Sequence, residues 1–311
     1  MGIDREWVHR TPNLSALSYR FAVRTDDLSV GRQIDAALAG LRDHYETAFV
    51  EHWYSLTAAE TPGGTLDVAR DGQILARGQQ SGDALGWVVW DVNRAAADAG
   101  ADHLLFHSGA IEADGTGVLI PGASGSGKST LTAGLVRAGL GYLTDELAAL
   151  HMASGRLVPY PKPITVKRGS FAVLADIGPD ACPAPGSRPW AGQEWQVAVG
   201  EGTGRAIGTP CVPGFVIVPR HDAGAATTLT PLSDTQTFFA MAVNAVNLVE
   251  HGSAGTCALG QLARGCRCFS LTFSDLDEAC RLVLDLVSPE TAHARAATEA
   301  TAAQGGTGRA P

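Results

Sequence analysis

The alternation of apolar and polar residues over the first hundred positions predicts a mixture of strands and helices. Residues Leu17–Arg24 alternate with a period of two, which is typical of a half-buried strand. In Ser29–Tyr45, apolar residues recur at helical spacing, and Ser29 is the expected N-cap. Three further strands and one helix are expected at Trp53–Leu56, Thr65–Ala69, Ile74–Arg77 and Ala84–Ala99.

From residue 102 onward, apolar runs and helical periods alternate along the chain, which indicates the α/β class. The expected strands are His103–Ala113, Gly117–Pro121, Tyr142–Thr144, Leu147–Met152, Gly214–Pro219 and Arg267–Phe273. The expected helices are Lys128–Ala138, Ser233–Val249 and Asp275–Leu286. Gly178–Pro189 is rich in Pro and Gly and predicts a surface loop, and Ser288–Pro311 has no apolar period and predicts a disordered tail.

Composition and charge exclude several classes of protein. The 311 residues carry 23 basic and 32 acidic side chains, a formal charge of 23 − 32 = −9, without a basic run. We therefore expect no nucleic-acid partner. No apolar stretch approaches the roughly 20 residues of a membrane helix, and the N-terminus has no signal-like apolar segment, so a cytoplasmic protein is expected. The six cysteines form no C-x-x-C pair, which argues against a zinc site.

The basic residues are unevenly divided between the two types. Only Lys128, Lys162 and Lys167 are lysines, and the other 20 are arginines. Coding bias explains this division on its own. If lysine is generally avoided, however, the three that remain mark places where a compact ammonium serves better than a rigid guanidinium fork.

The strongest motif is a glycine-rich loop between an expected strand and an expected helix. It fits the pattern G-x-x-x-x-G-K-[ST], in which backbone N–H groups and the helix N-terminus surround phosphate oxygens. Lys128 would reach the terminal phosphates, and the Ser129 hydroxyl would bind Mg²⁺. The predicted phosphate-binding residues are Gly122, Ala123, Ser124, Gly125, Ser126, Gly127, Lys128, Ser129 and Thr130.

Two carboxylates and a histidine are candidates for the chemistry beside this loop. Asp145 and Glu146 follow the expected strand Tyr142–Thr144, one helix beyond Lys128. Carboxyl ends of parallel strands face the same crevice, so these side chains could hold Mg²⁺ or act as general base. His107 lies on the strand before the loop, where a core role and a catalytic role are both open.

These residues together resemble the C-terminal catalytic domain of HPr kinase/phosphorylase, and still more the broader HPr-kinase-related group. The similarity covers roughly residues 102–287. It implies a P-loop kinase core that binds ATP and Mg²⁺ through Lys128 and Ser129. The family's catalytic base, an aspartate, corresponds in position to Glu146, with Asp145 before it, so either carboxylate is a candidate base and Asp145 a candidate metal ligand. The family's histidine corresponds to His107.

The chain also departs from that family. The E-[IV]-R-G-[LI]-G run, which supplies a second metal carboxylate and part of the phosphorylase site, is absent. Phosphorolysis is therefore not expected, and neither is HPr itself as substrate. A Pro-rich segment, residues 159–167, is similar to a motif of the HPr-kinase-related group, some of whose members phosphorylate serine in ribosomally made precursor peptides.

The Pro-rich segment contains two of the three lysines. Each proline fixes φ, so the segment would hold Lys162 in a defined direction. Lys162 and Lys167 are therefore candidates for substrate or phosphate contacts, and a surface turn with solvated lysines is the alternative. Arg220, at the end of an expected strand, is a weaker candidate for the same role.

The expected function is that of an ATP- and Mg²⁺-dependent kinase acting on a Ser or Thr hydroxyl of a peptide or protein, such as a precursor peptide or carrier protein. Residues 1–100 would form a small α/β domain for substrate docking, 101–287 the kinase domain and 288–311 the tail. An ATP-binding regulatory module and a small-metabolite kinase remain as alternatives. A homo-oligomer is also open, because nothing in the sequence sets the oligomeric state.

Overall fold

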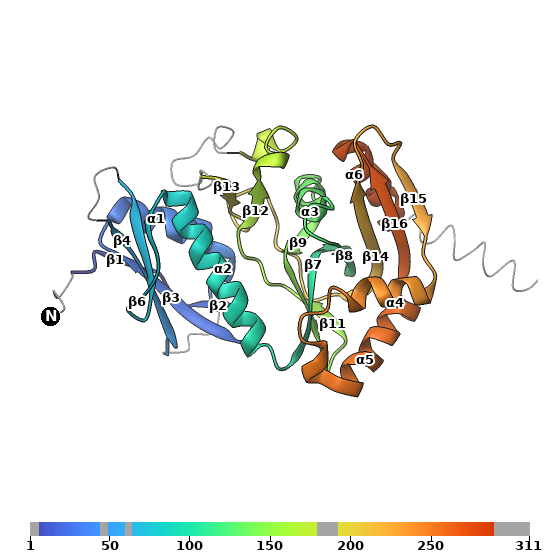
Figure 1. Cartoon of the computed structure of the whole chain (residues 1–311), viewed down its shortest axis with the longest axis horizontal. Helices are drawn as coiled ribbons and strands as arrows, with labels where there is room; N and C mark the ends of the chain where they lie inside the picture. The colour runs from blue at the N-terminus through green and yellow to red at the C-terminus, as the bar shows by residue number, and fades with distance from the viewer. Residues whose placement is uncertain (1–5, 44–48, 60–63, 179–191, 289–311) are drawn as a thin grey trace, which may run out of the picture.

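The structure, a computed structural model, describes residues 6–43, 49–59, 64–178 and 192–288. These residues form two larger sheets, which share no strand, and a two-stranded one (Figure 1). The α/β class expected from the sequence is confirmed. The expected loop Gly178–Pro189 and the expected tail Ser288–Pro311 lie almost wholly outside the described residues. No helix in the described ranges is long and apolar enough to cross a membrane.

The first sheet has six strands in the order β1-β3-β4-β5-β6, with β2 paired to β3. The strands are β1 His9–Arg10, β2 Leu14–Ala16, β3 Tyr19–Thr25, β4 His52–Ala58, β5 Leu66–Arg70 and β6 Gln73–Gln79. Helices α1 (Leu28–Ala37) and α2 (Ser81–Ala99) contribute to its core. β3 and β4 are parallel, because α1 makes the crossover between them. The four strands expected here are confirmed: β4 and β6 are longer than expected, β5 is shifted by one residue, and β3 begins two residues later than expected.

The helix expected at Ser29–Tyr45 is shorter than predicted, and Ser29 is not its N-cap. The Asp27 carboxylate accepts the backbone N–H groups of Ser29 and Val30, at 2.7 and 3.0 Å, and begins the helix two residues earlier. A carboxylate caps better here because it also complements the helix dipole. The helix ends at Ala37 and is followed by a 3₁₀ turn, Ala39–Leu41.

The second sheet has eight strands in the order β11-β10-β7-β8-β14-β16-β15, with β9 paired to β7. The strands are β7 His103–Ala113, β8 Thr116–Pro121, β9 Gly141–Thr144, β10 Leu147–His151, β11 Arg156–Val158, β14 Val212–His221, β15 Thr228–Pro231 and β16 Arg267–Phe273. β8, β14 and β16 are parallel. β9 and β8 are both antiparallel to β7, so they run in the same direction and end at the same edge.

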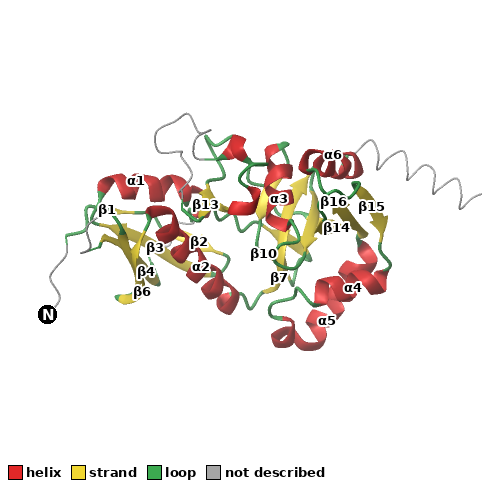
Figure 2. Ribbon diagram, turned by 45° about the horizontal axis from the view of Figure 1, so that its top comes forward, coloured by secondary structure: helices red, strands yellow, loops and turns green. Residues whose placement is uncertain are grey.

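Helices cover both faces of this sheet (Figure 2). α3 (Lys128–Arg137) and α6 (Leu276–Val287) share a core with Val118, Ile120 and Ile217. α4 (Asp234–Ala242) and α5 (Leu248–Gly265) share another with Leu119 and Val216. Neighbouring residues of β8 and β14 therefore serve opposite cores, as the period of two requires.

The prediction of a single helix at Ser233–Val249 is wrong, because one helix ends at Ala242 and another begins at Leu248. The connecting segment pairs with the edge of β7 instead. Its Asn244 carbonyl accepts the His107 N–H at 2.7 Å, and its Val246 N–H donates to the Leu105 carbonyl at 2.8 Å. These hydrogen bonds pair backbone groups at an open edge of β7, and this stabilisation outweighs the local sequence preference for a continuous helix.

Candidate functional site

A cavity of about 770 Å³ opens at the edge where β8 and β9 end. Its walls come from the loop that leads into α3, from helix α2, and from the hairpin of β12 (Ile164–Lys167) and β13 (Glu194–Val197). The polar and charged side chains that line it are Asn93, His107, Ser124, Lys128, Ser129, Thr130, Asp145, Glu146, Thr165, Lys167, Ser170, Glu194, Gln196, His221 and Ser274. Residues distant in sequence therefore meet at one cavity.

The glycine-rich loop makes a tight turn into α3. Gly125 and Gly127 adopt positive φ angles of 84° and 92°, which only glycine adopts readily. The helix then begins directly at Lys128, so its first N–H groups, which have no partner within the helix, lie beside the cavity. Gly122, Ala123 and Ser126 belong to the loop but do not line the cavity, whereas the other predicted loop residues do.

We expect Gly127→Ala to destabilise the fold by about 1–3 kcal/mol, because φ is positive and an added Cβ would lie 2.8 Å from the Phe273 ring. Gly125→Ala is the matched control. Its φ is also positive, but a Cβ there would meet nothing within 4 Å. Urea unfolding should show the larger loss for Gly127→Ala, and equal losses would mean that the contact with Phe273 does not constrain the loop.

Lys128 is buried at the base of the cavity, with 7% of its surface exposed. Burial lowers the pKa of its ammonium, and the negative charges of Asp145 and Glu146 oppose that shift. The side chain therefore carries a poorly hydrated positive charge, which a phosphate group would stabilise.

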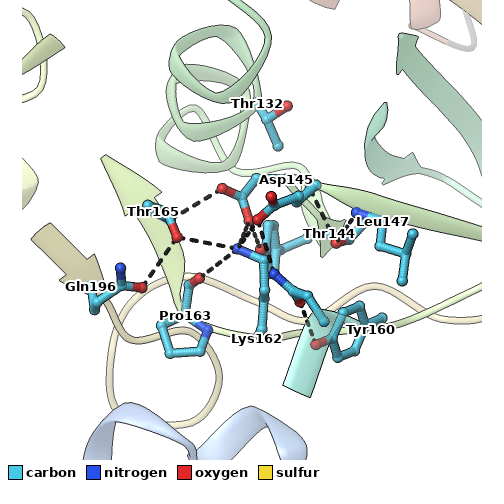
Figure 3. Close-up of polar contacts among 12 residues, drawn as sticks. Thr132, Thr144, Asp145, Leu147, Tyr160, Lys162, Pro163, Thr165 and Gln196 are labelled. Atoms are coloured by element: carbon cyan, nitrogen blue, oxygen red, sulfur yellow. Dashed lines mark hydrogen bonds and ion pairs between the residues drawn. The ribbon is translucent and has the colours of Figure 1, made fainter. Parts of the chain in front are cut away.

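Asp145 is almost completely buried, with 1% of its surface exposed, and three donors hold its carboxylate (Figure 3). Oδ1 accepts hydrogen bonds from the Tyr142 hydroxyl at 2.7 Å and from Lys162 Nζ at 2.6 Å. Oδ2 accepts the Thr165 N–H at 3.1 Å. Asp145 also lines the cavity, and these three hydrogen bonds fix its carboxylate in place.

Lys162 is completely buried beneath Asp145, so the alternative of a solvated surface turn is wrong for this residue. Its Nζ donates to Asp145, to the Pro163 carbonyl at 3.1 Å and to the Thr165 hydroxyl at 3.3 Å (Figure 3). Burial lowers its pKa, but the carboxylates of Asp145 and Glu146 outweigh burial, and the net pKa is raised. Lys162 does not line the cavity itself, but its partners Asp145, Glu146 and Thr165 do, so it acts on the site through them.

Glu146 is the more accessible of the two acidic residues. Its side chain is 41% exposed, and it lines the cavity. Oε2 accepts a hydrogen bond from Asn93 Nδ2 at 3.0 Å and lies 3.6 Å from Lys162 Nζ. Among the described residues, none hydrogen-bonds to Oε1, so this oxygen is the one left for a ligand.

His107 and Lys167 also face the cavity. Burial lowers the pKa of the His107 imidazole, the charge of Lys128 lowers it further, and Glu146 opposes both. The imidazole is therefore mainly neutral at pH 7, so it can donate one hydrogen bond and accept another. Lys167 is exposed and lies directly across the hairpin from Glu194.

Arg220 is not part of the cavity. Its side chain is 73% exposed and pairs with Asp222 at 3.3 Å, whereas the next residue, His221, does line the cavity. Sequence reasoning also missed Asn93, Thr165 and Gln196. The only signal for Asn93 is its place on one face of α2, seven residues after Gly86, which also lines the cavity.

The oxygen donors at the cavity suit a hard divalent cation. Ser129 offers a hydroxyl, and Asp145 and Glu146 offer carboxylates. No group of three or more His, Cys, Asp or Glu residues in the described part of the chain could hold a metal by itself. Mg²⁺ commonly takes only one or two protein carboxylates and completes its shell with water and substrate phosphates, so these residues would suit it if phosphate groups were bound beside them.

No family model matches the chain, and no curated protein matches it. What the site does must therefore be inferred from the chemistry of its own residues.

Proposed function

We propose that the protein is an ATP-dependent kinase of the P-loop type that transfers the γ-phosphate to a Ser or Thr hydroxyl of a peptide or protein. The observation that carries the proposal is the meeting of buried Lys128, at the start of α3, with an accessible carboxylate, Glu146, at a single cavity. A buried ammonium beside free helix N–H groups suits phosphate, and a carboxylate near it suits a hydroxyl nucleophile.

In this proposal the loop residues and Lys128 hold the phosphates of ATP. Ser129 and Asp145 would hold Mg²⁺, which supplies charge stabilisation to the transferring phosphoryl group. The neutral His107 donates a hydrogen bond to a phosphate oxygen, and Lys167 extends the positive charge around the site. The proposal therefore assigns an HPr-kinase-like nucleotide-binding core to the chain.

Glu146 is the better candidate for the general base. The Asp145 carboxylate already accepts hydrogen bonds from Tyr142, Lys162 and Thr165, which compete for the lone pairs that a base needs. Glu146 keeps one oxygen for the acceptor hydroxyl. It accepts the hydroxyl proton while the hydroxyl oxygen bonds to the γ-phosphorus, and the bond to the bridging oxygen breaks to release ADP.

We expect Glu146→Gln to bind Mg·ATP as the wild type does but to lower the rate of phosphate transfer to water by about 10²–10⁴-fold, the usual contribution of a general base. Asp145→Asn should weaken Mg²⁺-dependent ATP binding as well. The measurements are calorimetric titration with Mg·ATP and release of inorganic phosphate. Glu201→Gln, at an exposed position outside the cavity, is the control. Wild-type turnover in both site variants would refute these roles.

A further inference from the structure

Helix α2 belongs to the first sheet but presents one of its faces to the cavity. Gly86, Val89, Trp90 and Asn93 line the cavity and follow one another at helical spacing. Gly86 leaves room on this face, since a Cβ there would meet only the Gln196 amide nitrogen, at 3.8 Å. The segment assigned to substrate docking thus forms a wall of the proposed reaction site.

Asn93 connects the two parts of the chain through both ends of its amide. Nδ2 donates to Glu146 Oε2 at 3.0 Å, and Oδ1 accepts a hydrogen bond from the Tyr160 hydroxyl at 2.6 Å. The Glu146 carboxylate fixes which way the amide points, because a carboxylate only accepts hydrogen bonds and the nitrogen must therefore face it. The amide oxygen then faces the Tyr160 hydroxyl, which donates to it.

Tyr160 is a rigid anchor for this amide. It is almost completely buried and belongs to the core of the first sheet, and its N–H donates to the Leu143 carbonyl at 2.9 Å. The next residue, Pro161, packs against Gly40 so closely that a Cβ at Gly40 would lie 2.5 Å from its carbonyl oxygen. The two parts of the chain are therefore tightly packed at the point where Asn93 reaches Glu146.

We propose that Asn93 is a positioning residue for phosphate transfer, which holds Glu146 Oε2 so that Oε1 faces the acceptor hydroxyl. The inference rests on the proposed function, and it makes residues 1–100 part of the reaction centre in addition to any docking role. Without the amide, Lys162 at 3.6 Å is the one remaining partner of the Glu146 side chain among the described residues, and a side chain exposed to 41% would rotate among several rotamers.

The test is a double-mutant cycle on ATP turnover with Asn93→Asp and Glu146→Gln. Asn93→Asp keeps the acceptor for Tyr160 but turns a second carboxylate toward Glu146. We expect it to lower kcat by about 10–100-fold, the usual cost of losing such a supporting contact, with KM for ATP unchanged within about twofold. In the Glu146→Gln background, Asn93→Asp should have no further effect on kcat, because the residue acts through Glu146.

Asp98→Asn is the matched control, because it also exchanges a carboxylate and an amide on the same helix. Asp98 is exposed and lies outside the cavity, so this variant should leave kcat unchanged. Two results would overturn the inference and leave the proposed function standing. One is that the rate losses of Asn93→Asp and Glu146→Gln multiply in the double variant, and the other is that Asn93→Asp raises KM while kcat stays constant. Turnover that survives Glu146→Gln would instead overturn the assigned base in the proposed function.

A second measurement decides the matter if the wild type binds ATP without turning it over. This measurement is NMR of the Asn93 side-chain amide, whose resonances are assigned by their loss in Asn93→Asp. They should shift in Glu146→Gln, because this variant changes the hydrogen-bond partner of Nδ2. Resonances that stay in place would overturn the inference without any reference to activity.

Discussion

Replacing Lys162 with methionine is expected to lower the free energy of unfolding by about 3–5 kcal/mol. Lys162 is completely buried, and its ammonium lies 2.6 Å from Asp145 Oδ1. Removing the cation leaves the Asp145 charge almost completely buried, and among the described residues only Tyr142 and Thr165 still hydrogen-bond to it. Such an uncompensated charge costs far more than the loss of an exposed ion pair.

Urea unfolding of three further variants separates charge from packing. Lys162→Met combined with Asp145→Asn should recover part of the stability, because neither charge then remains unpaired. Lys162→Arg should cost about 1–3 kcal/mol, since the larger guanidinium must fit a filled space. Lys167→Met, at an exposed lysine of the same segment, should stay within about 0.5 kcal/mol of the wild type. Equal losses at positions 162 and 167 would contradict the buried pair.

Replacing Lys128 with alanine is expected to weaken Mg·ATP binding by about 2–5 kcal/mol, roughly 30-fold or more, because the phosphates then lose a buried charge partner. The fold should survive, since burial disfavours the Lys128 charge in the free protein, as its lowered pKa indicates. At Lys128 we therefore expect weaker ATP binding with little change in stability, whereas at Lys162 the expected change is a loss of stability.

Calorimetric titration with Mg·ATP measures this difference, with urea unfolding as the check on the fold. Lys167→Ala is the matched control, and a smaller loss of affinity is expected because an exposed ammonium is already well solvated. Lys128→Arg should bind Mg·ATP less well than the wild type, since the guanidinium group is larger than the ammonium it replaces. Full affinity in Lys128→Ala would show that the loop does not bind ATP phosphates.

The elements that depend on local patterns could be predicted from the sequence. The strands and helices around the glycine-rich loop have the expected order, and α6 begins within one residue of the expected position. Asp145 and Glu146 lie at the same edge as the loop, because β9 runs in the same direction as β8. These features follow from contiguous residues and from the direction of neighbouring strands.

Features that depend on distant partners could not be predicted in this way. The break between α4 and α5 depends on hydrogen bonds to β7, more than 130 positions earlier in the chain. The burial of Lys162 depends on packing around a Pro-Lys-Pro sequence that is equally typical of a surface turn. Asn93 reaches Glu146 across 53 positions of sequence, and no motif connects the two residues.

The scarcity of lysine gains a structural meaning from these contacts. Lys128 and Lys167 line the cavity, and Lys162 lies beneath it on Asp145, so all three lysines of the chain gather at one site. Their surroundings differ, because one is exposed, one is at the base of the cavity and one is completely buried. The three Lys→Arg variants should therefore differ in effect, with position 167 the most tolerant.

The most direct test of the central claim is transfer of labelled γ-phosphate from Mg·ATP to a degenerate library of Ser- and Thr-containing peptides. The account predicts acid-stable phosphoserine or phosphothreonine in the library with the wild type, and loss of that label with Lys128→Ala and with Glu146→Gln. The contradicting result has two parts: ATP binding depends on Lys128, but the wild type labels the peptides no more than Glu146→Gln does. That result would contradict a peptide kinase and favour a regulatory ATP-binding module or a kinase of small metabolites.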